Sequence, residues 1–166
     1  MVSLIQSEFK RRVFEESFDR IENCLERLSY EQVWHKPNSN TNSIGNLVLH
    51  LLGNVRQYIC CGIGEQKDIR ERSKEFLAES AVPSKELLHR LEALKGDVLQ
   101  VIESLNETKL TKIYEVQGFS ESGMSIVIHV IEHFSYHVGQ IALYTKLLVD
   151  EDLGFYAGLD LEAKSS

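Results

Sequence analysis

Apolar residues recur along most of the chain at alternating intervals of three and four, the spacing of a helix that buries one face. The first such stretch covers residues 3–28 and carries charged residues on its other faces. A second stretch, residues 44–61, is apolar on most sides and is expected to be largely buried. The same periodicity returns over residues 84–105, and again from residue 122 or 125 to residue 149. The pattern therefore predicts four long helices.

The segments between these helices read differently. Residues 35–43, HKPNSNTNS, are polar and contain a proline and three asparagines, which predicts a loop. Asn42 or Ser43 at its end can cap the next helix. Residues 67–81 are charged and predict a short helix or an irregular link. Residues 111–123 alternate briefly, which predicts an extended loop or a short hairpin.

Four helices joined by short and medium links predict an all-α fold, a four-helix bundle. The chain has 166 residues, a length that suits one domain spanning residues 1–166. Its apolar fraction of 43% and charged fraction of 26% are typical of a globular protein. Only two prolines occur, which agrees with long helices because proline breaks them.

The net charge of −7 disfavours nucleic-acid binding, because an acidic surface repels phosphate backbones. No apolar run is long enough for a membrane span, and the first residues do not resemble a signal peptide. A cytoplasmic protein is therefore expected, with Cys24, Cys60 and Cys61 as reduced thiols. Adjacent residues on a helix point in different directions, so Cys60 and Cys61 are a poor redox or metal pair.

Residues 129–141, HVIEHFSYHVGQI, hold three of the chain's six histidines, each four residues after the last. Residues four apart share one face of a helix, so the side chains of His133 and His137 can converge on one ion. Both border the apolar stripe and so face the bundle interior or its mouth. His50 lies in the middle of the most apolar helix, where a lone imidazole without a partner is unfavourable. The residues thus indicate a metal site on facing helices.

A simpler explanation stays open beside the metal. A single interior histidine, such as His50 taken alone, is more often a hydrogen-bonded core residue than a ligand. His129 could extend the ligand row, but successive steps of four drift about 40° around the helix, so we expect it at the rim or behind the ligands. His35 in a polar loop and His89 on a charged turn are expected to be solvated.

Three further residues of the fourth helix carry expectations. Gly139 interrupts the helix, where glycine costs about 1 kcal/mol relative to alanine, and this predicts that another helix approaches closely. Gln140 either bonds a neighbouring loop or helix end, or is simply exposed. Glu132 projects about 100° away from His133 and is not expected to orient its imidazole.

The stretches SIGNLVLHLLGNVRQY, residues 43–58, and EHFSYHVGQI, residues 132–141, resemble the DinB/YfiT-like superfamily of metal-dependent proteins. The resemblance covers most of the chain and rests on one histidine of the second helix and the string HxxxHxGQI. It implies an up-down-down-up four-helix bundle and a homodimer. It also implies a divalent metal, zinc or nickel, held by His50, His133 and His137. His129 is not part of the family motif.

Characterised members of this superfamily include thiol S-transferases that use bacillithiol, glutathione or mycothiol, and a thiol-dependent isomerase. The resemblance therefore implies a thiol S-transferase with a low-molecular-weight thiol as cosubstrate and a small-molecule substrate. Three imidazoles leave a fourth position open on zinc, where a bound thiol would be deprotonated and become a nucleophile.

Other functions stay open from the sequence alone. Metal-bound water could serve a metal-dependent hydrolase. The metal could instead be structural, in a non-catalytic dimeric stress-response or metal-binding module. A third reading is a thiol or metal sensor that uses Cys60 and Cys61. The catalytic and cofactor-binding residues beyond the three histidines are not identified by the sequence.

Overall fold

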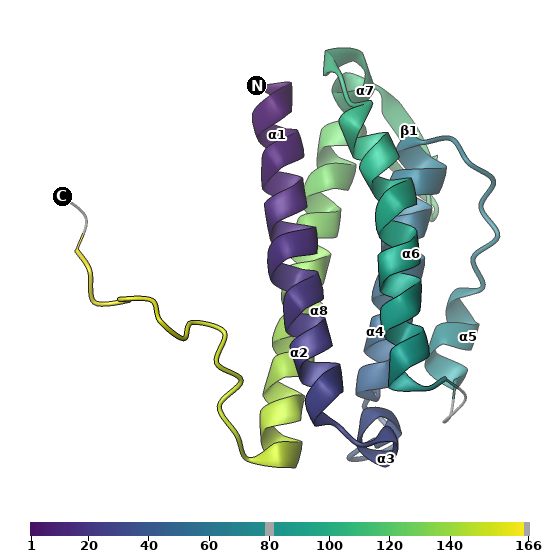
Figure 1. Cartoon of the computed structure of the whole chain (residues 1–166). Coiled ribbons are helices and arrows are strands. Elements are labelled where there is room, and N and C mark those ends of the chain that lie inside the picture. Colours follow the sequence, from purple (N-terminus) through teal and green to yellow (C-terminus); the bar gives the residue numbers. More distant parts are fainter. Residues whose placement is uncertain (79–81, 165–166) are drawn as a thin grey trace.

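The computed structural model describes residues 1–78 and 82–164 and shows a bundle of long helical segments with one small hairpin (Figure 1). The first long segment is continuous and comprises α1 (Val2–Phe9), the π-helical η1 (Lys10–Phe18) and α2 (Asp19–Arg27). The other three are α4 (Ile44–Val55) with the π-helical η2 (Arg56–Ile63), then α6 (Ser84–Glu103), and α8 (Gly123–Val149). The all-α fold predicted from the periodicity is confirmed.

The four long segments follow the up-down-down-up order that the resemblance implies. In Figure 1 the first and last segments descend, whereas α4 and α6 both ascend. The segments η1 and α2 pack against α8, and α4 packs against both α6 and α8. Because α4 and α6 are parallel, the chain between them must return along the length of the bundle. This return carries the short helix α5 (Arg72–Leu77), which packs on α4.

The return segment coincides with residues 67–81, for which the sequence predicts a short helix or an irregular link, and α5 confirms the helix. Residues 79–81 of that prediction lie outside the described residues. Two further short helices escape the periodicity because each is a single turn or little more. They are α3 (Tyr30–Trp34) and α7 (Glu107–Thr111).

Side-chain caps fix where the site-bearing helices begin. Ser43 accepts a hydrogen bond from the Asn46 amide, and the Asn46 side chain accepts one from the Ser43 amide, which is a capping box. The predicted loop cap is therefore Ser43 rather than Asn42. Ser122 caps α8 in the same way by accepting from the Ser125 amide.

The hairpin predicted within residues 111–123 is present. Strands β1 (Ile113–Val116) and β2 (Phe119–Ser122) pair antiparallel, with Val116 opposite Phe119. The two turn residues, Gln117 and Gly118, have φ values of 53° and 82°, as a two-residue type I′ turn requires. The hairpin leads directly into the first turn of α8.

The core lies between the four long segments and is built from their apolar stripes. The most deeply buried large side chains include Phe9, Ile21, Leu51, Leu87 and Phe134, one or more from each segment. Within the described residues, no helix is long and apolar enough to cross a membrane. The three cysteines are free thiols, and Cys24 and Cys60 are buried.

Candidate metal centre

Three histidines from two helices meet inside the bundle. His50 comes from α4, and His133 and His137 come from successive turns of α8. One ring nitrogen from each lies within 4.8 Å of the others, and the Nε2 atoms of His50 and His133 are 2.8 Å apart. His50 is buried, and the other two are half-buried. The three residues singled out by spacing and resemblance are thus brought together by the fold.

A carboxylate orients the imidazole of His50. Glu75 Oε2 lies 3.0 Å from His50 Nδ1, and a carboxylate can only accept, so the proton belongs on Nδ1. Burial alone would raise the pKa of Glu75, but hydrogen bonds from Arg70 and His50 outweigh burial and hold that pKa below its ordinary value. Glu75 is therefore ionised near neutral pH. The bare Nε2 lone pair of His50 then points toward His133.

Arg70 holds Glu75 in this position. Its guanidinium donates to both carboxylate oxygens, from Nε at 2.7 Å and from Nη2 at 2.8 Å. It also donates from Nη1 to Gln57 Oε1 at 2.7 Å. The Arg70 Nη2 atom lies 3.2 Å from His50 Nδ1 as well, but it has Glu75 as a better acceptor. The side chains of Arg70 and Glu75 are 6% and 11% exposed, so this ion pair is largely shielded from water.

Residues 64–78, here called the strap, carry both Arg70 and Glu75 across the outside of α4. The strap is fastened by Asn46, whose Nδ2 donates to the carbonyls of Glu75 and Ala78 at 2.9 Å each. Gly53 makes room for it, because a Cβ at this position would lie 2.0 Å from Glu75 Oε1. A glycine inside the most apolar helix is therefore explained by the carboxylate that packs on it.

The two histidines of α8 are also held as neutral imidazoles. His137 Nδ1 lies 2.8 Å from Gln140 Oε1, an acceptor that leaves the Nε2 lone pair of His137 free. Burial, followed by the neighbouring His137 and His50, lowers the pKa of His133 to about 3. Burial also lowers the pKa of His137, against the opposing effect of the hydrogen bond that its Nδ1 donates to Gln140 Oε1. Neutral imidazole is the form that binds a metal ion.

The donor set fits a divalent ion of the first transition row. Imidazole nitrogen suits zinc, nickel, copper and iron, and the Nδ1 of a ligating histidine is usually held by a carboxylate or carbonyl oxygen. His50 and His137 meet this condition through Glu75 and Gln140. With the His50 proton on Nδ1, the Nε2 lone pair of His50 faces His133 Nε2 at 2.8 Å, where it can accept from His133 or bind an ion.

His129 stands one turn away from this group, as expected for a residue at its rim. Its ring stacks between those of Tyr58 and His133, with centroid separations of 4.2 and 5.2 Å. Its Nε2 lies 3.3 Å from Asn54 Nδ2. Asn54 is 2% exposed, and its Oδ1 has no hydrogen-bond partner among the described residues. This oxygen is thus a buried acceptor without a partner in the part of the chain that the structure describes, one turn from the three histidines.

The remaining expectations have mixed outcomes. His35 and His89 are exposed, as predicted, and the His35 ring contacts the Tyr144 hydroxyl. Glu132 is exposed and does not contact the histidine group. The prediction for Gly139 is wrong within this chain, because open space surrounds the position of a Cβ there. Gln140 neither bonds a neighbouring loop or helix end nor is simply exposed, because its Oε1 accepts a hydrogen bond from His137 Nδ1 in the same helix.

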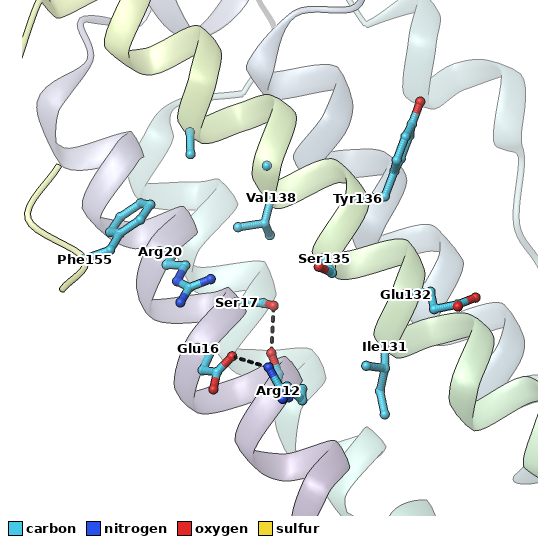
Figure 2. A pocket seen from close by; sticks show the side chains of 12 residues that line it. Arg12, Glu16, Ser17, Arg20, Ile131, Glu132, Ser135, Tyr136, Val138 and Phe155 are labelled. Carbon is cyan, nitrogen blue, oxygen red and sulfur yellow. Dashed lines mark hydrogen bonds and ion pairs between the residues drawn. The ribbon is translucent and has the colours of Figure 1, made fainter. Parts of the chain in front are cut away.

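Three hollows are lined in part by residues of α8, but none of them is lined by the three histidines. One, of about 390 Å³, sits beside His129 and has Tyr58 and Glu121 in its walls. A larger one, of about 670 Å³, runs between α8 and the first helical segment, where Arg12 and Arg20 line it (Figure 2). The larger hollow has none of the three histidines in its walls, so size alone does not locate the site.

Sequence reasoning missed the groups that orient His50. Arg70 and Glu75 belong to a charged stretch, and such a stretch usually faces solvent. The signal that could have found them is Gly53, because a glycine within a buried helix indicates a close neighbour. Gly139 is also a glycine within a helix, but no neighbouring residue lies close to it within the described chain.

Comparison with known proteins gives a family and a fold. Residues 5–157 match the model of a family described as a protein of unknown function, DUF1572. No curated protein matches the chain. Among solved structures, a conserved protein from Enterococcus faecalis aligns with a TM-score of 0.71 at 13% identity, covering 91% of this chain and 98% of that one.

Two further solved structures are described as DinB-like proteins. One, from Bacillus cereus, has a TM-score of 0.65 at 14% identity and covers 82% of this chain and 88% of its own. The other, YjoA from Bacillus subtilis, has a TM-score of 0.65 at 17% identity and covers 90% and 94%. At these identities the likeness establishes the fold alone.

Proposed function

The chain belongs to the DUF1572 family, which is DinB/YfiT-like, and on this premise we propose that it binds one divalent ion through His50, His133 and His137. The single observation that carries the proposal is the approach of three ring nitrogens to within 4.8 Å, with His50 oriented by Glu75. We propose zinc or nickel as the ion, since both accept imidazole ligands. A core histidine with no further role would not need a buried ion pair behind it.

The reaction that we propose is transfer of a low-molecular-weight thiol, of the bacillithiol or glutathione type, to a small electrophilic substrate. When bound, the ion would supply a Lewis acid that lowers the pKa of a thiol. The thiol loses its proton to solvent, and its sulfur forms a bond to the electrophilic carbon. The leaving group departs with the bonding electron pair, so that atoms and charge balance.

The chain's own residues would serve this reaction in distinct ways. Glu75 keeps the His50 lone pair directed inward, and the buried setting of His133 keeps its ring neutral. The hollow beside His129 would take part of the substrate next to the ligand group.

We also propose the cellular setting of this activity. Residues 1–166 would form a single domain that works in the cytoplasm as a homodimer on a small-molecule substrate. Packing of all four long segments around one core supports the single domain. The free thiols of Cys24, Cys60 and Cys61 agree with a reducing compartment.

The proposal is tested by metal analysis followed by a transfer assay. Protein as isolated should contain about one divalent ion per chain, because a three-histidine site holds one. His50→Ala, His133→Ala and His137→Ala should each lose most of it, and His89→Ala, an exposed histidine, should not. A panel of glutathione, bacillithiol and mycothiol with a chromogenic electrophile should give turnover that depends on the ion. Full metal occupancy in the three alanine variants would refute the site.

A further inference from the structure

The outward face of α8 is apolar for most of its length. Val130, Phe134, Val138 and Ile141 point into the core, and the opposite side of the helix carries large apolar side chains in solvent. Several large apolar side chains exposed on one helix face indicate an interaction site. Its members are Ile128, Tyr136, Leu143 and Leu147, which are 48%, 65%, 62% and 73% exposed.

The middle of this face is open. A Cβ added at Gly139 would meet no atom within 4 Å, apart from the backbone of its own helix. Ser135 and Ala142, one turn before and after, are also small. Small residues in this arrangement let the backbone of a second helix come close. Glu132, Tyr136 and Gly139 line the hollow between α8 and the first helical segment, so this face forms one wall of it. In Figure 2 the side chains of Tyr136 and Glu132 point away from Arg12 and Arg20 on the other wall.

Two charged residues frame the open centre symmetrically. Glu132 lies seven residues before Gly139, and Lys146 lies seven residues after it. A step of seven falls only about 20° short of two full turns, so the three residues lie almost in line along the helix. Neither Glu132 nor Lys146 forms an ion pair with any residue in 1–78 or 82–164. The face therefore carries one unmatched charge of each sign at equal distances from its middle.

We infer that a second copy of this chain packs its α8 antiparallel against this face, with the two-fold axis passing at Gly139. A two-fold axis makes each contact reciprocal, so Glu132 faces the partner's Lys146 and Lys146 faces the partner's Glu132. Tyr136 then lies near the partner's Ala142, and Ser135 near the partner's Leu143. A parallel arrangement would oppose like charges at both positions. The charge pattern thus selects the second copy and its direction.

This inference rests on the homodimer that we propose, and it ties that dimer to the metal centre. The ring of Tyr136 meets the ring of His137 edge to face, with centroids 4.9 Å apart. Covering Tyr136 with the partner's helix would fix the ring that abuts one proposed ligand. The empty space at Gly139, unexplained within one chain, becomes the point where two backbones cross.

The test is sedimentation velocity of the full chain at micromolar to hundred-micromolar concentrations. Wild type should sediment as a dimer of the 19.0 kDa chain. Gly139→Glu should sediment as a monomer, because it places two like charges at the axis. Gly96→Glu is the matched control, since Gly96 is an exposed helical glycine with equally open surroundings, and it should remain dimeric.

Charge reversal provides a second test that leaves the backbone untouched. Glu132→Lys and Lys146→Glu should each weaken the dimer on the order of ten-fold, and the double reversal should restore it. A dimer that persists unchanged in Gly139→Glu would overturn this surface while leaving the homodimer intact. A monomeric wild type would overturn both. Metal content, measured on the same samples, reports separately on the three-histidine site.

Discussion

Glu75 Oε2 lies 3.0 Å from His50 Nδ1, although 25 residues separate the two in sequence. The same carboxylate is gripped by Arg70 through both of its oxygens. His50 therefore cannot turn its ring without breaking its hydrogen bond to a largely buried carboxylate. A residue from a charged stretch, for which the sequence alone predicts a short helix or an irregular link, thus determines which nitrogen of His50 faces the bundle interior.

Glu75→Gln should weaken metal binding by about 10–100-fold, because groups that orient a ligand commonly contribute that much to affinity. The amide keeps the size and an acceptor for His50 but loses the charge that holds Arg70. Affinity is measured by competition with a chromogenic chelator. Glu71→Gln, an exposed strap residue paired with Lys74, is the control and should bind like wild type. Equal affinity in both variants would show that Glu75 does not position His50.

Gly53→Ala should lower the free energy of unfolding by about 1–3 kcal/mol, because the added methyl displaces Glu75 and leaves buried hydrogen bonds unmade. Urea denaturation followed by circular dichroism measures this change. Gly96→Ala has open space around it and should instead stabilise the protein by up to about 1 kcal/mol through helix propensity. The opposite signs separate a packing effect from a propensity effect, and a stabilised Gly53→Ala would contradict the close approach.

Native Cys60 should resist alkylation near neutral pH. Burial, the largest cause, raises the pKa of Cys60 to about 11, so the reactive thiolate is scarce below that pH and increases as pH rises. At pH 8 about one molecule in a thousand carries the thiolate, roughly a hundred-fold fewer than for an ordinary cysteine. Iodoacetamide labelling between pH 7 and 10, read by mass spectrometry, should modify the partly exposed Cys61 before Cys60.

The cysteines should also be dispensable for the metal. Cys60→Ser combined with Cys61→Ser should leave metal content unchanged, since neither thiol belongs to the three-histidine group. Metal loss in this double variant would support the alternative function of a thiol or metal sensor. Labelling of native Cys60 at the rate of free cysteine would do the same.

Chelation should leave the bundle folded. Each buried leucine contributes about 1.5–3 kcal/mol, and all four long segments contribute apolar side chains to the core. Helical circular dichroism should persist after treatment with EDTA, with a modest fall in Tm, whereas thiol transfer should stop and return when the ion is restored. Outright unfolding on chelation would make the ion a structural element, as in a zinc finger.

His129→Phe should keep the ion but slow turnover. The phenyl ring preserves the stack between Tyr58 and His133, and it removes the ring nitrogen that faces Asn54. Metal content should match wild type, and the transfer rate should fall. Loss of the ion in this variant would place His129 among the ligands.

Sequence periodicity predicts the four long helices because each buries a continuous apolar stripe, whose spacing is a local property. It also indicates His50, His133 and His137, since a four-residue step and a lone histidine in an apolar helix are visible locally. The π-helical turns of η1 and η2 escape prediction, because residues spaced three and four apart look alike in either helix. One such turn is marked by Ser17, whose hydroxyl donates to the carbonyl of Arg12, five residues earlier.

The missed residues depend on contacts that the local pattern does not encode. Arg70 lies in an irregular stretch and Glu75 on a short helix, where no period indicates what either one touches. Gly53 and Gly139 look alike in sequence, yet one lies under a carboxylate and the other faces open space. The two glycines differ because the strap passes over Gly53 and not over Gly139, which only the three-dimensional structure shows.

That path has a consequence for how the chain can vary. Two parallel neighbouring helices cannot be joined by a tight turn, so α4 and α6 require a connection that travels the length of the bundle (Figure 1). In this protein that connection is the strap, which crosses α4 and places Arg70 and Glu75 beside His50. The same segment therefore both connects α4 to α6 and orients the ring of His50. A deletion that shortened the return would disturb the order of the helices and the tautomer of the central histidine together.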